Sequence, residues 1–177
     1  MGKSIIIYKS KYGAAKEYAR LLAEKIHCEA FESHHLNPNQ INNFDTVILC
    51  GGVYASHISG ISFLKKNFEK LKSKRIIIFA VGASPYGDQM ISELKHQNLK
   101  GTMNNIELFY GRGMWNEEAL TFKDRLLCNM VKKMAEKKSL SSNESQESFL
   151  ISIFGKKENW IDIKYLEPVL NYLEERS

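Results

Sequence analysis

Hydrophobic residues in this chain form three unbroken runs, and the stretches between them mix apolar and polar positions. The runs cover residues 5–7, 47–50 and 76–81. Strands that are apolar at every position are typical of parallel sheets covered on both faces. After the first run, apolar residues recur at the spacing of one helix face, at Ala15, Tyr18, Ala19, Leu22, Ala23 and Ile26. The start of the chain therefore predicts a buried strand followed directly by a helix.

The rest of the chain continues this alternation of strands and helices. We expect further strands over 27–33, 45–50, 75–81 and 105–110. We expect helices over 61–71, from an N-cap at Asp88 past Leu94, over about 117–137, and from just before Pro168. Aspartate is a favoured N-cap, and proline is tolerated only near a helix start. The polar, serine-rich stretch 139–148 has the composition of a mobile loop.

This order of elements predicts a single α/β domain over 1–177. The expected architecture is a three-layer sandwich, in which a five-stranded parallel sheet of order 2-1-3-4-5 has helices on both faces. Ligands of such sheets bind beyond the carboxyl ends of the strands, where the strand order reverses. Glycine-containing loops at 10–15, 51–60 and 82–87 follow the first, third and fourth expected strands. We expect these three loops to meet at one edge of the sheet.

The loop after the first strand, Ser10-Lys11-Tyr12-Gly13-Ala14-Ala15, has the features of an anion site. A helix that begins here offers free backbone N–H groups and the positive end of its dipole. Ser10 can donate a hydroxyl and Gly13 permits close approach of the backbone, with counter-charge from Lys9, Lys11 or Lys16. The alternative is an ordinary connection without a ligand. The loop matches neither the Walker A pattern nor the dinucleotide fingerprint, which argues against nucleotide hydrolysis.

Composition fits a globular domain that buries a core without disulfides or metal, since 44% of the 177 residues are hydrophobic and 25% are charged. Cys28, Cys50 and Cys128 lie far apart in no metal-binding pattern, and Cys50 falls in an expected strand as a small core residue. His34 and His35 are adjacent. Because adjacent strand residues point to opposite faces, they make a poor chelate, and we assign no metal.

Charge and hydropathy bear on location and partners. No apolar run approaches the roughly 20 residues that cross a bilayer, and no leader pattern opens the chain, so we expect a cytoplasmic protein. A net charge of +5 favours an acidic partner, an anionic ligand or an anionic membrane surface. No nucleic-acid-binding motif is present, and no nucleic-acid partner is expected. The helix over 117–138 is either a core helix with a solvated end or a peripheral membrane contact.

With these loops in place, nearly the whole chain resembles the flavodoxin family. Residues 10–15 fit a loosened form of its phosphate loop, with Tyr12 and Ala15 replacing two of the three hydroxyl residues of stricter members. The resemblance implies a flavodoxin-like fold and FMN as cofactor, with two further loops bordering the flavin ring. The implied cofactor-binding residues are Ser10, Lys11, Tyr12, Gly13, Ala14, Ala15, Gly52, Val53, Tyr54, Ala55, His57, Gly82, Ala83, Ser84, Tyr86 and Gly87.

Within these loops the roles of three side chains stay open. Tyr54 or Tyr86 would stack on the flavin or simply cover the end of the sheet. His57 would bond the flavin, donate a proton or sit at the rim of the site. No side chain need act as a catalyst, because the flavin itself carries the electrons, and we assign no catalytic residue.

The C-terminal third looks like the flavodoxin-type, menaquinone-linked protoporphyrinogen oxidases of bacteria. The matching segments are 110–115, 122–134 and Trp160-Ile161-Asp162, followed by the last helix. Those enzymes use FMN and pass electrons to a quinone at the membrane. They also carry a long basic insertion near the fourth strand, whereas the region 82–101 of this chain is short and not especially basic.

The resemblance therefore implies an FMN-binding redox protein, an oxidoreductase that passes electrons between FMN and a quinone-like or other small substrate. One alternative is a protoporphyrinogen oxidase proper, which oxidises a porphyrinogen. Another is a flavodoxin-type electron carrier that docks on a redox partner protein, and a third is a flavin-free binding module. Carrier flavodoxins are strongly acidic, so the net charge of +5 favours an enzyme or a membrane-associated role.

Overall fold

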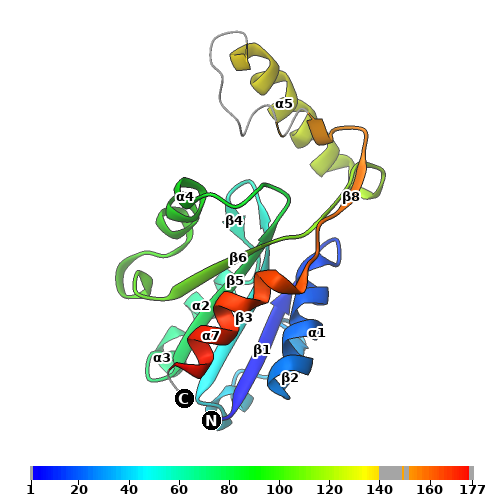
Figure 1. Ribbon diagram of the computed structural model, residues 1–177. Helices are drawn as coiled ribbons and strands as arrows, with labels where there is room; N and C mark the ends of the chain where they lie inside the picture. The colour runs from blue at the N-terminus through cyan, green and yellow to red at the C-terminus, as the bar shows by residue number, and fades with distance from the viewer. Residues whose placement is uncertain (1, 140–148, 150–151, 176–177) are drawn as a thin grey trace.

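The computed structural model describes residues 2–139, 149 and 152–175 (Figure 1). Five parallel strands form the central sheet: β1 (Ser4–Lys9), β2 (Glu29–Glu32), β3 (Thr46–Tyr54), β5 (Arg75–Gly82) and β6 (Glu107–Arg112). Their spatial order is β2-β1-β3-β5-β6. Counted among the parallel strands alone, this is the order 2-1-3-4-5 expected from the sequence. The prediction of an α/β fold with this topology is confirmed.

Helices cover both faces of the sheet, as Figure 1 shows. On one face α1 (Ala14–Ile26) and α7 (Glu167–Glu174) enclose a core that includes Tyr18, Phe79 and Val169. On the other face α2 (Ile61–Lys66), α3 (Phe68–Leu71) and α4 (Asp88–Asn98) lie over a second cluster with Leu64 and Leu94. Because both faces are covered, the strands are apolar at every position, and residues 5–7 of β1 are fully buried. Cys50 is buried in the same way, as expected.

Element boundaries differ from the expectation at several places. The strand expected over 27–33 spans only Glu29–Glu32, and the helix expected from about 117 begins at Phe122. Strand β3 continues through the glycine pair to Tyr54, turns at Ala55 and Ser56 with φ of 46° and 62°, and pairs antiparallel with β4 (His57–Ile58). The helix expected over 61–71 is interrupted at Asn67, whose amide side chain bonds the Phe63 carbonyl. Asp88 is the first residue of α4 and not its cap; its carboxylate accepts a hydrogen bond from the Tyr86 hydroxyl at 3.0 Å.

The region after β6 contains a strand pair that the sequence did not reveal. β7 (Met114–Asn116) pairs antiparallel with β8 (Lys157–Asn159), across about 40 positions of intervening chain. Short 3₁₀ turns lie at Gln40–Asn43, Gly101–Met103, Glu117–Ala119 and Ile163–Leu166. The last helix begins at Glu167 with Pro168 in its first turn, as predicted. Ser139 ends α5 (Phe122–Ser139), and the remainder of the expected mobile loop, 140–148, lies outside the described residues.

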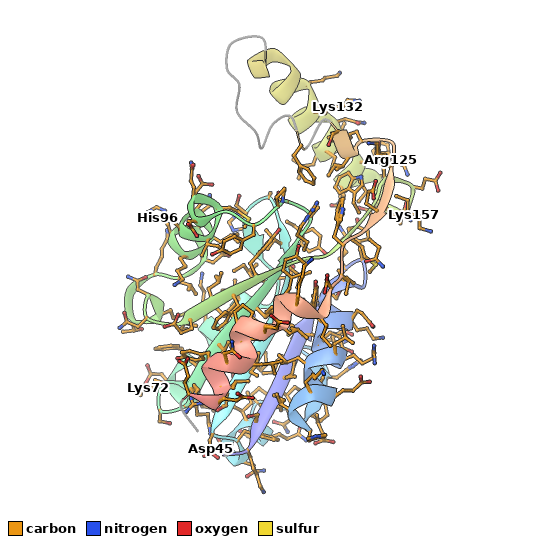
Figure 2. The ribbon with its side chains drawn as sticks, in the orientation of Figure 1. Asp45, Lys72, His96, Arg125, Lys132 and Lys157 are labelled. Carbon is orange, nitrogen blue, oxygen red and sulfur yellow. The ribbon has the colours of Figure 1, made fainter. Side chains whose placement is uncertain are left out.

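Helix α5 extends beyond the carboxyl edge of the sheet (Figure 1). Its large exposed apolar side chains are Phe122, Leu126, Leu127 and Met130, and Phe122 is 82% exposed. The interpretation of this segment as a core helix is therefore wrong for its described side chains. Arg125, Lys132 and Lys157 gather at this end of the molecule, as Figure 2 shows. Within the described residues, no helix is both long enough and apolar enough to cross a bilayer.

Candidate functional site

Pairing register places three loops along the carboxyl edge of the sheet. Lys9 at the end of β1 lies opposite Gly51, Gly52 lies opposite Val81, and Gly82 at the end of β5 lies opposite Arg112. The loops after β1, β3 and β5 therefore leave the sheet side by side. The structure thus has the convergence that the sequence predicted, at the topological switch point where such folds bind ligands.

The loop after β1 keeps the features of an anion site. Gly13 adopts a left-handed conformation, φ 95°, immediately before α1, and Ser10 Oγ accepts a hydrogen bond from its N–H at 3.0 Å. A Cβ atom added to Gly13 would meet only Met114 Cε, at 3.5 Å. The N–H groups of Ala14 and Ala15 have no acceptor in the described part of the chain. An anion at this helix start would receive these donors and the positive end of the helix dipole.

Lys11 and Tyr12 turn away from this helix start and hold the beginning of α5. The Lys11 ammonium and the Tyr12 hydroxyl both donate to one carboxylate oxygen of Asp124. The Thr121 N–H donates to the Tyr12 hydroxyl at 3.2 Å. The hydrogen bond from Lys11, followed by that from Tyr12, holds the pKa of Asp124 below its ordinary value. The same bond to Asp124 raises the pKa of Lys11, so the pair stays ionised around neutral pH.

Replacing Asp124 with asparagine is expected to lower the free energy of unfolding at pH 7 by less than about 1 kcal/mol, because the pair is partly exposed and screened. A carboxylate whose pKa is lower in the folded than in the unfolded protein stabilises the fold fully at pH values above its ordinary pKa of 3.8. This stabilisation is lost as the pH falls from 3.8 through the folded-state pKa. The difference between wild type and Asp124→Asn should therefore stay constant from pH 7 to pH 5. Urea unfolding at these two pH values measures it, and a difference that already shrinks at pH 5 would refute the assignment.

Tyr54 spans from the end of β3 to the loop after β1. Its ring lies over Gly52, and its hydroxyl accepts a hydrogen bond from the Lys11 N–H at 3.3 Å. The Tyr12 and Tyr54 rings meet edge to face, with centroids 6.0 Å apart. Burial raises the pKa of Tyr54, so its hydroxyl remains protonated at neutral pH. Tyr54 thus lines the loop after β1, while its hairpin partner His57 is exposed.

The loop after β5 is tied to the end of β6. The Ala83 carbonyl accepts a hydrogen bond from Arg112 Nε at 3.2 Å, and the Ser84 carbonyl accepts one from the Tyr110 hydroxyl at 2.8 Å. Tyr86 points elsewhere, since it is 60% exposed and donates to Asp88. The backbone of this loop is therefore fixed at Ala83 and Ser84, whereas the Tyr86 side chain lies toward solvent.

Sequence reasoning did not assign Arg112 to the site, although the residue stands there. The Arg112 guanidinium carbon lies 4.1 Å from the centre of the Trp160 ring and 5.1 Å from that of Phe149. The only local signal was an arginine at the carboxyl end of β6. Its neighbours come from more than 35 positions away, and only the folded chain brings them together.

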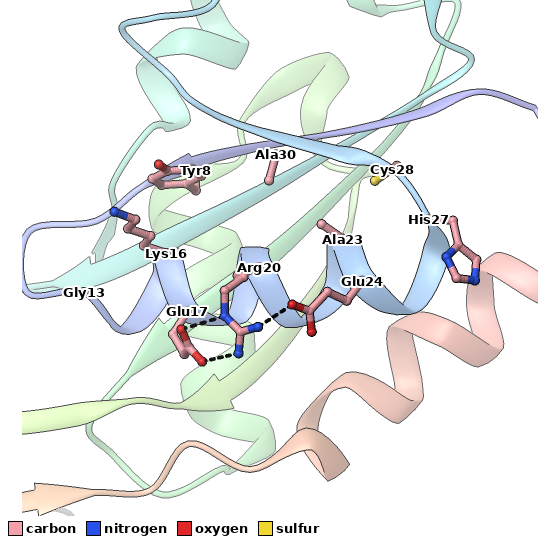
Figure 3. A pocket seen from close by; sticks show the side chains of 10 residues that line it. All are labelled: Tyr8, Gly13, Lys16, Glu17, Arg20, Ala23, Glu24, His27, Cys28 and Ala30. Atoms are coloured by element: carbon pink, nitrogen blue, oxygen red, sulfur yellow. Dashed lines mark hydrogen bonds and ion pairs between the residues drawn. The ribbon is translucent and has the colours of Figure 1, made fainter.

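The three lysines considered as counter-charges are directed elsewhere. Lys9 Nζ lies 4.0 Å from a Glu32 carboxylate oxygen, and Lys11 pairs with Asp124. Lys16 lines a groove of about 470 Å³ along α1, which Figure 3 shows. Of the expected cofactor-binding residues only Gly13 reaches this groove, whose wall carries the ion pairs of Arg20 with its own helix. The groove therefore does not coincide with the meeting point of the three loops.

The adjacent histidines require a correction. Strand β2 ends at Glu32, and residues 33–35 form a turn, so His34 and His35 do not point to opposite faces. Their ring centroids lie 3.9 Å apart, and the ligand atoms of Glu32, His34 and His35 all lie within 4.8 Å of one another. The argument that strand geometry prevents chelation is wrong. Both histidines are exposed, Glu32 also faces Lys9, and the cluster lies at the end of the edge strand β2 and in the turn that follows it.

Comparison with protein-family models shows the family to which this chain belongs. A family model described as a flavodoxin domain matches residues 5–142. The chain belongs to the flavodoxin family. The match covers the five parallel strands, apart from Ser4 at the start of β1, and all of α5, so the loops after β1, β3 and β5 lie within the flavodoxin domain. No curated protein matches the chain.

Solved structures of similar fold include several flavodoxins. An archaeal flavodoxin is 14% identical, with 72% of this chain and 92% of that chain covered and a TM-score of 0.44. A WrbA-like flavodoxin from Agrobacterium tumefaciens is 18% identical, with coverages of 71% and 88% and a TM-score of 0.44. A Fusobacterium nucleatum flavodoxin variant bound to flavin mononucleotide is 14% identical, with coverages of 69% and 74% and a TM-score of 0.36. The fold assignment does not depend on these similarities, because the strand order already establishes it.

Proposed function

We propose that this protein is an FMN-dependent oxidoreductase, which passes electrons between FMN and a quinone-like or other small substrate. The observation that carries the proposal is the carboxyl edge of a flavodoxin domain. There the first N–H groups of α1, which have no acceptor among the described residues, lie together with the left-handed Gly13 and the loops after β3 and β5. These residues fit a phosphate monoester at the helix start. The solved flavodoxin from Fusobacterium nucleatum, which is bound to flavin mononucleotide, supports the same cofactor.

The chain's own residues would divide the work of holding FMN. Ala14 and Ala15 would donate their N–H groups to the phosphate, and Ser10 would keep the Gly13 backbone in place. Gly52 and Val53, with Tyr54, Ala55 and His57, would border one side of the ring, and Ala83 and Ser84, with Gly82 and Gly87, the other. Tyr86, which donates to Asp88, would not contact the ring. When bound, FMN supplies the one- and two-electron chemistry, which no side chain here provides.

Two features favour a small substrate over a large protein partner. The net charge is +5, whereas carrier flavodoxins dock through acidic surfaces. Trp160 and Phe149 also pack over Arg112 beside the loop after β5, which covers part of the edge where a partner protein would approach. The related protoporphyrinogen oxidase activity, to which the C-terminal third has a resemblance, stays a prediction.

The exposed apolar face of α5 supports a peripheral membrane contact, where lipid-dissolved quinones are found. Phe122, Leu126 and Met130 recur at helical spacing along this face, and Lys123 and Lys133 are exposed beside them. Apolar side chains flanked by lysines are the pattern of helices that lie on anionic lipid surfaces. We include this contact in the proposal.

The proposal is tested by mixing anaerobically reduced protein with a water-soluble quinone, with a long-chain quinone in anionic vesicles, and with cytochrome c. Both quinones should reoxidise the protein faster than cytochrome c does. The variant Leu126→Glu should slow the reaction with the vesicle quinone alone. Faster transfer to cytochrome c would favour the electron carrier instead. An unchanged vesicle rate in Leu126→Glu would remove the membrane contact. In a separate assay, production of fluorescent porphyrin from a porphyrinogen by the oxidised protein, with quinone as the electron acceptor, would establish the oxidase.

A further inference from the structure

Arg112 occupies a fixed position at the carboxyl edge. It ends β6 opposite Gly82, and its carbonyl accepts a hydrogen bond from the Tyr18 hydroxyl at 2.7 Å. The next residue is equally constrained, because the Gly113 N–H donates to the Gly82 carbonyl at 2.8 Å. These backbone hydrogen bonds therefore fix the position of the Arg112 Cα atom beside the loop after β5.

The guanidinium group is held in that place by contacts at two sites. Nε donates to the Ala83 carbonyl at 3.2 Å, and the group stacks on the Trp160 ring. Trp160 is itself anchored, since its N–H donates to the Gly113 carbonyl at 2.9 Å. Ordering an arginine side chain in this way costs conformational entropy. Stacking on an indole offsets part of that cost, but it leaves the outer N–H groups without acceptors.

One of those outer groups is buried and unbonded. Arg112 Nη2 is shielded from solvent and has no hydrogen-bond partner, a state that only Trp115 Nε1 shares among the buried side-chain atoms described. In the described part of the chain no carboxylate lies within ion-pair distance of Arg112. A buried, unsatisfied donor on a charged group is expensive, and native proteins rarely keep one without a reason. An acceptor supplied by a ligand would satisfy it.

The position of Arg112 indicates which part of the ligand it meets. Leu108 and Tyr110, which share its side of β6, belong to the core under α4. Ala15, at the start of α1, belongs to the core on the opposite face. The Arg112 side chain therefore leaves β6 on the face covered by α4 and reaches the loop after β5, whereas the helix start that fits a phosphate belongs to the opposite face. Its neighbour Ala83 is one of the residues expected to border the ring.

We propose that Arg112 is a flavin-binding residue whose Nη2 donates to a carbonyl oxygen at the ring end of FMN and not to the phosphate. The inference rests on the proposed function and adds that the positively charged Arg112 guanidinium contacts the flavin ring. A cation beside the ring oxygens stabilises the more electron-rich, reduced form of the cofactor. Arg112 therefore raises the reduction potential of the bound flavin as well as its affinity.

The test compares wild type, Arg112→Gln and Arg112→Lys by titration with FMN and with riboflavin, which lacks the phosphate. Arg112→Gln should weaken the binding of both flavins by about tenfold, the usual effect of losing a charged hydrogen bond. Arg112→Lys should recover part of the loss. The reduction potential of bound FMN, measured at saturating FMN, should fall in Arg112→Gln.

Arg125→Gln is the matched control, because Arg125 is exposed at the same end of the molecule and its guanidinium, among the described residues, bonds only the backbone carbonyls of Glu117 and Glu118. It should leave affinity and potential unchanged. Loss of FMN binding with riboflavin binding retained would move Arg112 to the phosphate, and an unchanged affinity and potential would make it a structural residue. Either result overturns the inference. Failure of wild type to bind any flavin overturns the proposed function instead. If Arg112→Gln does not fold, Arg112→Lys carries the same comparison, with an intermediate loss.

Discussion

Replacing Gly13 with valine is expected to weaken FMN binding by about tenfold. Gly13 has φ 95°, a conformation that costs an L-residue roughly 1–2 kcal/mol, and more when the residue is β-branched. The valine variant will relax to another conformation, in which the loop no longer presents the Gly13 N–H to Ser10 and the first N–H groups of α1 to a phosphate. Binding must then restore the strained form, so the strain energy is subtracted from the affinity. Titration of each variant with FMN measures the effect.

Gly101→Val is the control for this prediction. Gly101 also has a left-handed conformation, φ 62°, with no atom within 4 Å of an added Cβ, but it lies before β6, at the amino end of the sheet. Both substitutions carry a similar backbone penalty, so both should lower thermal stability to a similar extent. Only Gly13→Val should lose affinity. Equal loss of affinity in both variants would show that the effect is general destabilisation and not damage to the loop.

Replacing Gly51 with alanine is expected to cost about 2 kcal/mol or more in the free energy of unfolding and to lower Tm by roughly 5 °C. An added Cβ would lie 2.3 Å from the Ser59 carbonyl oxygen and 2.6 Å from Ile58 Cγ2. The chain cannot move away easily, because the Ser59 N–H donates to Gly52 and Ile58 is buried. Thermal unfolding followed by circular dichroism measures the loss.

Gly52→Ala separates this backbone clash from a side-chain clash. There the three atoms nearest to an added Cβ all belong to the Tyr54 side chain, the closest at 3.0 Å, and this side chain can rotate. Gly52→Ala should therefore be less destabilising than Gly51→Ala. If the two variants are equally stable, close contact between β3 and the residues at the end of β4 is not the reason for a glycine at position 51.

The parallel core was predictable because its signal is local and strong. Residues 5–7 and 76–81 are apolar at every position, as strands must be when helices cover both faces, and the structure buries them all. The direction of parallel strands then places the loops that follow them at one edge. That is why the meeting of 10–15, 51–60 and 82–87 followed from the sequence without any knowledge of contacts.

Features that depend on distant partners were not predictable. β7 and β8 are three residues each and partly exposed, so neither has a pattern that distinguishes it from a loop. The bonds from Lys11 and Tyr12 to Asp124 join positions more than 110 residues apart. The exposure of Leu126 and Met130 was missed because an apolar stripe at helical spacing usually packs into a core. Arg112 was missed because its partners are distant in sequence, since Trp160 follows it by 48 positions and Ala83 precedes it by 29.

Titration of the purified protein with FMN, followed by flavin fluorescence and absorption, tests the central claim most directly. The expected result is saturable quenching with one FMN per chain at micromolar concentration and a shifted flavin spectrum. Ser10→Ala, which removes the acceptor of the Gly13 N–H, should bind more weakly. Unquenched fluorescence and an unshifted spectrum at micromolar FMN would contradict the claim. The flavodoxin domain would then be a flavin-free binding module.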